Sequence, residues 1–374
     1  MMRMLLRSTL ASIAFAALFP SAASARPCRV VGQSAPAYAA IDRAVTAFMQ
    51  AQNVHNSELA ISKHGRLVFS HAYSCGSYQG SPTATTTVFR LASNSKAWTS
   101  AAIDQLIGRG VISRSMRAFQ YLGIMRPLPL GATVDPRVYS ITVGDLIAHK
   151  SGWDDRIAPH WDPTHAMRHI ALALHLSHQI DRTQMVRYQL GQPLQEAPGA
   201  HYAYCNFCYV VLGMIVAKAS GMSYEGYVTQ DVAAPIGVHD LVVSPTLEPR
   251  LSNEVAHYYS PYIGLSAVYP LSGMHFPQPN GGDGLIREVG APAGGLATSA
   301  ASMIKLMYHY AIWGVGPPAP GWAREGSDAG TNTWAQQRTD GKNWAFLVNT
   351  RNYTTSNAFG DFTRQVNRLL NHLP

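Results

Sequence analysis

Periodic patterns of apolar residues mark the first part of the chain. Across residues 37–52, apolar positions recur at helical spacing. Residues 58–62 and 66–72 are instead two short runs of strand-forming residues on either side of His64 and Gly65, a pair typical of a tight turn. The pattern predicts a helix followed by a β-hairpin.

The last part of the chain repeats this combination in the opposite order. Residues 331–337 and 343–350 are rich in strand-forming residues, and the polar segment 339–342 between them is suited to a turn. Residues 357–370 then show a helical period. We therefore expect an α+β fold in which both ends of the chain contribute strands to one antiparallel sheet flanked by helices.

The middle of the chain lacks this regularity and shows no internal repeat. Proline and glycine are concentrated at residues 127–136, 191–199 and 279–295, which indicates a loop-rich and mostly helical region. We predict a sheet lobe formed by residues 26–118 and 295–374, and a mostly helical lobe formed by residues 119–294. A cleft between two lobes is a common place for a ligand site.

The first 25 residues have the pattern of a targeting segment. Arg3 and Arg7 precede an apolar run at residues 10–19, and small residues at 23–25 follow it. This order predicts a secretory signal peptide cleaved after Ala25, because the run is too short to span a bilayer as a membrane anchor. We expect a periplasmic or secreted protein.

Composition describes a globular protein with a sizeable core. The 374 residues are 47% hydrophobic and 13% charged, with a formal net charge of +8. Removing Arg3 and Arg7 lowers that charge by two, to +6, and the other cations are scattered rather than clustered. The sequence therefore gives no support for nucleic-acid binding, and it predicts no membrane span after signal cleavage. It leaves the oligomeric state open.

Four cysteines form an even set in a chain that is expected to be exported. We predict that Cys28 pairs with Cys75, which would join the mature amino terminus to the sheet lobe. Cys205 and Cys208 form a Cys-x-x-Cys pair that reads either as a local disulfide or as two buried thiols. The chain has no second such pair to complete a four-thiolate zinc site.

The most informative chemical pattern lies in residues 89–110, where Ser93 and Lys96 stand three positions apart in a segment with helical periodicity. Both side chains would share one face of a helix. A serine hydroxyl needs a base within reach, and a lysine can act as that base when burial favours its neutral form. A second such pair, Ser302 and Lys305, is interpreted as part of an ordinary amphipathic surface helix.

Residues 89–96, Phe-Arg-Leu-Ala-Ser-Asn-Ser-Lys, resemble the nucleophile motif of the serine hydrolases related to class C β-lactamases and DD-peptidases. Similar segments follow in the family's order, and the resemblance runs from about residue 36 to 350. It implies a serine hydrolase that forms an acyl-enzyme with an ester, amide or lactam carbonyl. It also implies a small-molecule or short-peptide substrate and no metal or organic cofactor.

Residues 198–206 are similar to the family's Pro-Gly-x-x-x-x-Tyr-Ser-Asn segment. The resemblance implies that Tyr204 places a phenol beside the nucleophile and that Asn206 orients the substrate and Lys96. From the residue types alone, a core tyrosine and a helix-capping asparagine are the alternative.

Residues 141–153 also match the family and are interpreted as structural. Thr142 would cap a helix with Asp145 at its third position, and Ser151-Gly152 would end it. His149 would then lie in the last turn, where a histidine usually serves hydrogen bonding rather than catalysis.

The third family motif, Lys-Thr-Gly or His-x-Gly on a strand beside the nucleophile, matches residues 324–331 with a departure. Gly326 and Ser327 fit, whereas Arg324 and Glu325 replace the usual residues. The resemblance implies an oxyanion hole formed by the N–H groups of Ser93 and Ser327, with Arg324 and Gly326 also in the substrate-binding set.

Because successive residues of a strand point to opposite faces, only one of Arg324 and Glu325 can line the cleft of an unbent strand. We expect weak or absent penicillin hydrolysis, because Glu325 stands where relatives place a hydroxyl donor and adds a negative charge. If Glu325 lines the cleft, neutral esters or substrates with a free amine should be preferred; if Arg324 does, some affinity for carboxylates would persist. The departure also motivates an alternative, a non-catalytic envelope binding protein that keeps the fold.

Overall fold

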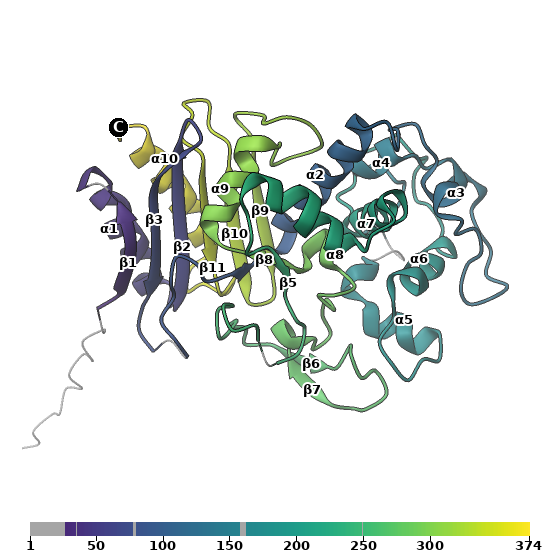
Figure 1. Ribbon diagram of the computed structural model, residues 1–374. Helices are drawn as coiled ribbons and strands as arrows, with labels where there is room; N and C mark the ends of the chain where they lie inside the picture. The colour runs from purple at the N-terminus through teal and green to yellow at the C-terminus, as the bar shows by residue number, and fades with distance from the viewer. Residues whose placement is uncertain (1–26, 35, 78–79, 158–161, 249) are drawn as a thin grey trace, which may run out of the picture.

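The computed structural model describes residues 27–34, 36–77, 80–157, 162–248 and 250–374. The predicted signal peptide, residues 1–25, lies outside this range. Figure 1 shows a sheet with helices against it in one half of the molecule and a mostly helical half beside it. The fold is the α+β arrangement that the sequence predicts.

The main sheet has six antiparallel strands and combines the two ends of the chain. Its strands, in spatial order, are β1 (Arg29–Ser34), β3 (Arg66–Ser74), β2 (Asn56–Lys63), β11 (Trp344–Val348), β10 (Thr331–Gln336) and β9 (Ala323–Asp328). The two ends meet where β2 pairs with β11, with Ala60 opposite Ala345. Among the described residues, strand β9 lies at the edge of the sheet and pairs with a strand on one side only.

Helices cover both faces of this sheet. Helices α1 (Ala39–Ala51) and α10 (Ala358–Leu370) share an apolar core with the sheet, in which the ring of Phe362 lies 4.5 Å from that of Phe48 and 4.7 Å from that of Phe346. Helix α9 (Ala300–His309) packs on β2, β3 and β11, and α2 (Ser95–Gly108) belongs to the larger core. Buried aromatic and aliphatic side chains thus fix the sheet from both sides.

The helical half is built around α7 (Asn206–Ser220) (Figure 1). The apolar residues of α7 are buried on nearly every side of the helix. Around it lie α3 (Ala118–Leu122), α4 (Val143–Ile147), α5 (Met167–Ala173), α6 (Arg182–Leu190) and α8 (Tyr224–Tyr227). Two small sheets contain the remaining described strands. One consists of β4 (Phe89–Arg90), β8 (Leu296–Thr298) and β5 (Val242–Val243), and the other is the hairpin of β6 (Ile263–Leu265) and β7 (His275–Pro277).

One predicted boundary is wrong. Thr142 and Asp145 form the expected capping box, but α4 ends at Ile147 rather than at Ser151-Gly152. His149 has a φ of +56°, a left-handed conformation that a helix cannot contain. The residue boundaries of the two lobes stay a prediction.

Both cysteine pairs are disulfide-bonded. Cys28 is linked to Cys75, as predicted, and Cys205 is linked to Cys208, which selects the local disulfide over two buried thiols. In the part of the chain that the structure describes, no single helix is long and apolar enough to cross a membrane. One pair, Asn206–Ser220 with Tyr224–Ile236, bent by 78°, reaches that length and composition together.

Candidate active site

The candidate nucleophile lies in a strained turn. The chain leaves β4, passes through a 3₁₀ turn at Ala92–Asn94 and enters α2 at Ser95. Ala92 has a φ of +46°, which is unusual for a residue with a Cβ and is a kind of strain found at functional sites. The turn carries Ser93, and Lys96 follows in the first turn of α2.

Hydrogen bonds bring four of the predicted residues together. The ammonium of Lys96 donates to Ser93 Oγ at 3.2 Å, and the phenol of Tyr204 donates to the same oxygen at 2.8 Å. Lys96 Nζ also donates to Asn206 Oδ1 at 2.6 Å and to the carbonyl oxygen of Ala293 at 2.7 Å. The hydroxyl of Ser93 is therefore within hydrogen-bond reach of two groups that can exchange a proton.

The surroundings shift both of these pKa values downward. Burial lowers the pKa of Lys96, and the nearby Tyr204 offsets only part of that effect. Burial alone would raise the pKa of Tyr204, but the charge of Lys96 and the hydrogen bonding with Lys96 and Ser93 outweigh it, so the net shift is downward. Lowered values move both groups toward the pH range in which general bases work.

Strand β9 approaches the nucleophile closely at Gly326. A Cβ at this position would lie 2.3 Å from the carbonyl oxygen of Leu91 and 3.1 Å from the backbone nitrogen of Asn94, so only glycine allows this contact. The next residue, Ser327, is exposed and lines a cavity of about 120 Å³ together with Ser93, Tyr204 and Asn206. The predicted oxyanion residues are thus on the same cavity.

Arg324 and Glu325 occupy opposite faces of β9. Arg324 is 1% exposed, donates from Nε to the carbonyl oxygen of Ile312 at 2.8 Å, and stacks its guanidinium 4.2 Å from the ring centre of Trp313. Glu325 is exposed and accepts a hydrogen bond from Asn332 at 2.9 Å. Of the two, Arg324 is the inward residue, although it does not line the 120 Å³ cavity. Its role in substrate binding stays a prediction.

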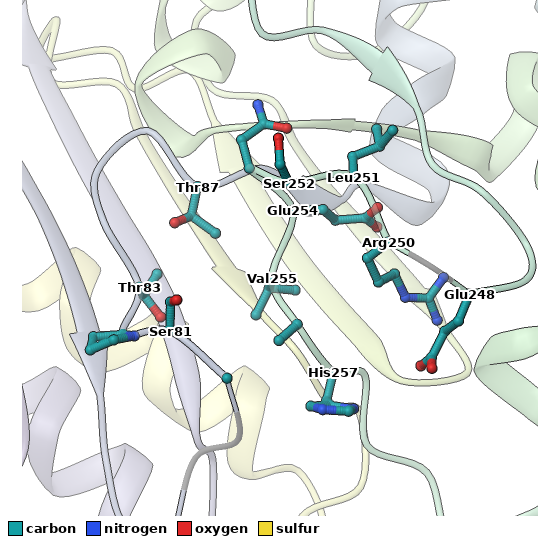
Figure 2. A pocket seen from close by; sticks show the side chains of 14 residues that line it. Ser81, Thr83, Thr87, Glu248, Arg250, Leu251, Ser252, Glu254, Val255 and His257 are labelled. Carbon is teal, nitrogen blue, oxygen red and sulfur yellow. The ribbon is translucent and has the colours of Figure 1, made fainter.

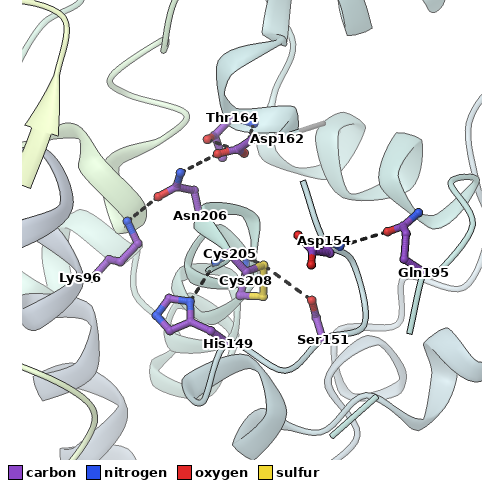
Figure 3. Close-up of a disulfide and its surroundings, with 10 residues drawn as sticks. All are labelled: Lys96, His149, Ser151, Asp154, Asp162, Thr164, Gln195, Cys205, Asn206 and Cys208. Carbon is purple, nitrogen blue, oxygen red and sulfur yellow. Dashed lines mark hydrogen bonds between the residues drawn. A yellow bond between two sulfur atoms is a disulfide. The ribbon is translucent and has the colours of Figure 1, made fainter. Parts of the chain in front are cut away.

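His149 supports Tyr204 from behind. Its Nδ1 accepts the backbone N–H of Cys205 at 3.0 Å (Figure 3). Its ring stacks on that of Tyr204 with centroids 4.8 Å apart and an angle of 19°. Burial, Lys96 and Arg324 lower the pKa of His149 to about 3, so the ring is neutral at neutral pH. Its contacts agree with the predicted structural role.

Sequence reasoning missed several polar residues on the cavity wall. Thr164, His165 and Asp328 line it, and Asp162 lies beside Asn206, to which it is hydrogen-bonded. The Asp-Pro pair at residues 162–163 signals a turn, but nothing in the sequence places that turn next to α7.

Two observations bear on other ligands. Among the described residues, no group of three or more histidine, cysteine or acidic side chains is placed to hold a metal ion. A larger cavity, of about 450 Å³, is lined by the residues drawn in Figure 2, among them the polar residues Thr83, Arg250 and Glu254. It contains none of the predicted site residues.

Comparison with known proteins places this arrangement in a family. The model of the family described as Beta-lactamase matches residues 41–360, which is most of the chain. The chain belongs to the beta-lactamase family. This family consists of serine hydrolases, which is the class of enzyme that the sequence motifs indicate.

Curated relatives of this beta-lactamase-family chain include proteins with different names. A putative D-alanyl-D-alanine carboxypeptidase of Escherichia coli (strain K12) is 25% identical over 207 residues, 53% of this chain and 45% of that protein. Esterase EstB of Burkholderia gladioli is 25% identical over 221 residues, 59% of this chain and 55% of that protein. The matched segments span about half the length of these relatives.

Solved structures share the fold across nearly the whole chain. The D-alanine carboxypeptidase AmpC from Burkholderia cenocepacia aligns with a TM-score of 0.61 and 16% identity, covering 90% of this chain and 99% of that one. A class C beta-lactamase aligns with a TM-score of 0.61 and 14% identity, covering 87% and 94%. At such identities the likeness supports the fold and leaves the substrate open.

Proposed function

We propose that this beta-lactamase-family protein hydrolyses its substrate through an acyl-enzyme on Ser93. The observation that carries the proposal is the pair of hydrogen bonds to Ser93 Oγ from Lys96 and Tyr204 at the edge of a cavity. A serine activated by neighbouring proton acceptors is the arrangement that nucleophilic catalysis requires.

In the proposed reaction, Ser93 Oγ attacks the substrate carbonyl while its proton passes to the Lys96–Tyr204 pair. The backbone N–H groups of Ser93 and Ser327 stabilise the oxyanion, and Asn206 orients both Lys96 and the substrate. The pair then returns the proton to the leaving group as the bond between the carbonyl carbon and that group breaks. Water attacks the resulting ester, its proton returns to Ser93, and a carboxylic acid is released.

The proposed substrates are esters, amides or lactams whose carbonyl can reach Ser93 in the cavity that it lines with Tyr204 and Asn206. The names of the relatives and structural neighbours cover carboxypeptidase, esterase and beta-lactamase activities, all of which attack a carbonyl. Glu325 does not line the cavity beside Ser93, but it shares a strand face with Ser327, which does, so weak hydrolysis of anionic β-lactams stays a prediction and β-lactams belong to the same test set.

We also propose that the protein is exported, to the periplasm or beyond. Two features support this proposal: the signal-peptide pattern of residues 1–25 and the two disulfides, which are typical of oxidising compartments. Cell fractionation followed by amino-terminal sequencing of the exported protein should give a chain that begins at residue 26. A full-length chain confined to the cytoplasm would contradict the proposal.

Labelling with a fluorophosphonate tests the catalytic proposal, since the reagent phosphonylates activated serines. Intact mass should show one adduct on the mature protein and none on Ser93→Ala. Ser302→Ala is a matched control, because Ser302 also precedes a lysine by three residues but donates its hydroxyl to Asp240 at 2.6 Å. Absence of an adduct on the wild type would favour the alternative, a non-catalytic binding protein.

A further inference from the structure

The side-chain amide of Asn206 is held from two sides. Its Oδ1 accepts a hydrogen bond from Lys96 Nζ at 2.6 Å, and its Nδ2 donates to Asp162 Oδ2 at 2.5 Å; Figure 3 shows both bonds. An amide presents an acceptor at one end and a donor at the other. Both neighbours therefore favour the same orientation of the amide: Lys96 donates to its oxygen, and Asp162 accepts from its nitrogen.

Asp162 is well suited to hold that nitrogen because its carboxylate is itself fixed. Oδ1 accepts the backbone N–H of Thr164 at 2.9 Å and its hydroxyl at 2.7 Å, and His165 Nδ1 lies 3.0 Å from Oδ2. Burial would raise the pKa of Asp162, but the contacts with His165, Asn206 and Thr164 outweigh it and lower that pKa. The carboxylate can only accept hydrogen bonds in this state.

The same group of residues connects the loop at Asp162 to strand β9. The ring of His165 lies between two acids, with Nδ1 at Asp162 and Nε2 3.9 Å from Asp328 Oδ1. Asp328 is buried and also bonded to the buried guanidinium of Arg287. The position of Asp162 is thus tied to the strand that carries Ser327.

We infer that Asp162 is a positioning residue for catalysis: it fixes the orientation of the Asn206 amide so that the amide oxygen faces Lys96. The inference rests on the proposed acyl-enzyme function. Without the carboxylate, the amide can turn by half a rotation and present its N–H₂ group to the lysine. Lys96 would then lose an acceptor and be displaced from Ser93.

A capping role is the structural alternative, since Asp162 precedes a 3₁₀ turn at Pro163–His165. Asp162→Asn separates the two roles because asparagine caps about as well as aspartate. Its oxygen can still accept from Thr164, but its N–H₂ group cannot accept from Asn206. We expect kcat for a p-nitrophenyl ester to fall about tenfold to hundredfold, the range of one hydrogen bond to a charged group, with little change in KM or melting temperature.

Asp135→Asn is the matched control. Asp135 also precedes a proline, at the start of the 3₁₀ turn Pro136–Ser140, and it caps that turn by accepting the N–H of Arg137 at 3.0 Å. It makes no contact with the site residues in the structure, so kcat should be unchanged. An equal loss in both variants would overturn the inference.

A double-mutant cycle tests whether Asp162 acts through Asn206. In an Asn206→Ala background, Asp162→Asn should cause no further loss of kcat, because the amide that it orients is gone. Full additivity of the two effects would overturn the inference.

An NMR measurement of the contact between Asn206 and Asp162 needs no catalytic turnover, so it tests this inference independently of the proposed function. The side-chain N–H₂ signal of Asn206, assigned by its loss in Asn206→Ala, should contain one proton shifted downfield by the carboxylate in NMR spectra. Asp162→Asn should remove that shift, and an unchanged signal would overturn the inference even in an active enzyme. If fluorophosphonate labels no serine, the catalytic proposal fails while the NMR result still decides the contact.

Discussion

Acidification should destabilise this protein in a way that can be traced to His149. The ring is 1% exposed, its Nδ1 already accepts a hydrogen bond from Cys205, and its Nε2 is buried with no hydrogen-bond partner among the described residues. Protonation would add a positive charge to a site that already holds Lys96 and Arg324. Burial and these two cations lower the pKa of His149 from 6.5 to about 3.

The size of the effect follows from this difference. In the unfolded chain the imidazole binds a proton below a pKa of about 6.5, whereas in the folded protein it does not until about pH 3. The contribution of His149 to the free energy of unfolding is therefore fully present above pH 6.5 and is lost as the pH falls toward 3. The loss is about 1.4 kcal/mol per pH unit, or on the order of 5 kcal/mol over the whole pKa difference.

Urea unfolding of the wild type and of His149→Asn between pH 7 and pH 4 measures the contribution of His149 to the free energy of unfolding. The asparagine oxygen can accept the N–H of Cys205, and asparagine does not titrate. We expect the variant to be less stable at pH 7, because it loses the stacking on Tyr204. Its stability should fall less steeply with acid, by about 1.4 kcal/mol per unit. Parallel curves would refute the reasoning, because the other titrating groups are common to both proteins.

Three further predictions follow from single contacts. Tyr204→Phe should lower kcat for an ester about a hundredfold or more at an unchanged melting temperature, because the change removes a phenol that carries a proton. Steady-state kinetics at saturating ester measures this loss, and an unchanged rate would contradict the prediction. Gly326→Ala should lower the activity and should lower the free energy of unfolding by about 1–3 kcal/mol, because the new Cβ would meet the carbonyl oxygen of Leu91. Urea unfolding measures the second effect, and a fully active variant of unchanged stability would argue against that close approach. Cys28→Ser should cost about 2–4 kcal/mol by removing the link to Cys75, also measured by urea unfolding, and an unchanged midpoint would show that the link contributes little.

The ends of the chain were predictable because their periodicity is strong. The helix expected over residues 37–52 is α1, and the strands expected over 331–337 and 343–350 are β10 and β11 within a few residues. Strand β1 was missed because six residues with two valines and a glycine show little alternation. The end of α4 was missed because the left-handed conformation of His149 depends on its tertiary contacts.

Motifs predicted which residues meet at Ser93, but they could not predict the residues that support them. Lys96, Tyr204 and Asn206 lie in segments with recognisable local patterns. In the structure, Lys96 and Tyr204 both bond to Ser93, and Asn206 bonds to Lys96. Asp162 belongs to a loop whose position depends on packing against α7 and β9. The orientation of Arg324 likewise depends on the alternation of the strand, which the sequence narrowed to two choices without deciding between them.

The backbone conformation of Cys205 explains how Tyr204 and Asn206 can both reach Lys96. Cys205 is extended, with φ −137° and ψ 103°, and in an extended chain the residues on either side of a given residue point the same way. The side chain of Cys205 must then point in the opposite direction, where it forms the disulfide with Cys208 and accepts a hydrogen bond from Ser151 (Figure 3). Because the N–H of Cys205 is also bound to His149, this one residue is held through its main chain and its side chain. Fixing Cys205 therefore fixes the direction of both neighbours, so the disulfide outside the cavity helps to keep the phenol and the amide aimed at the lysine.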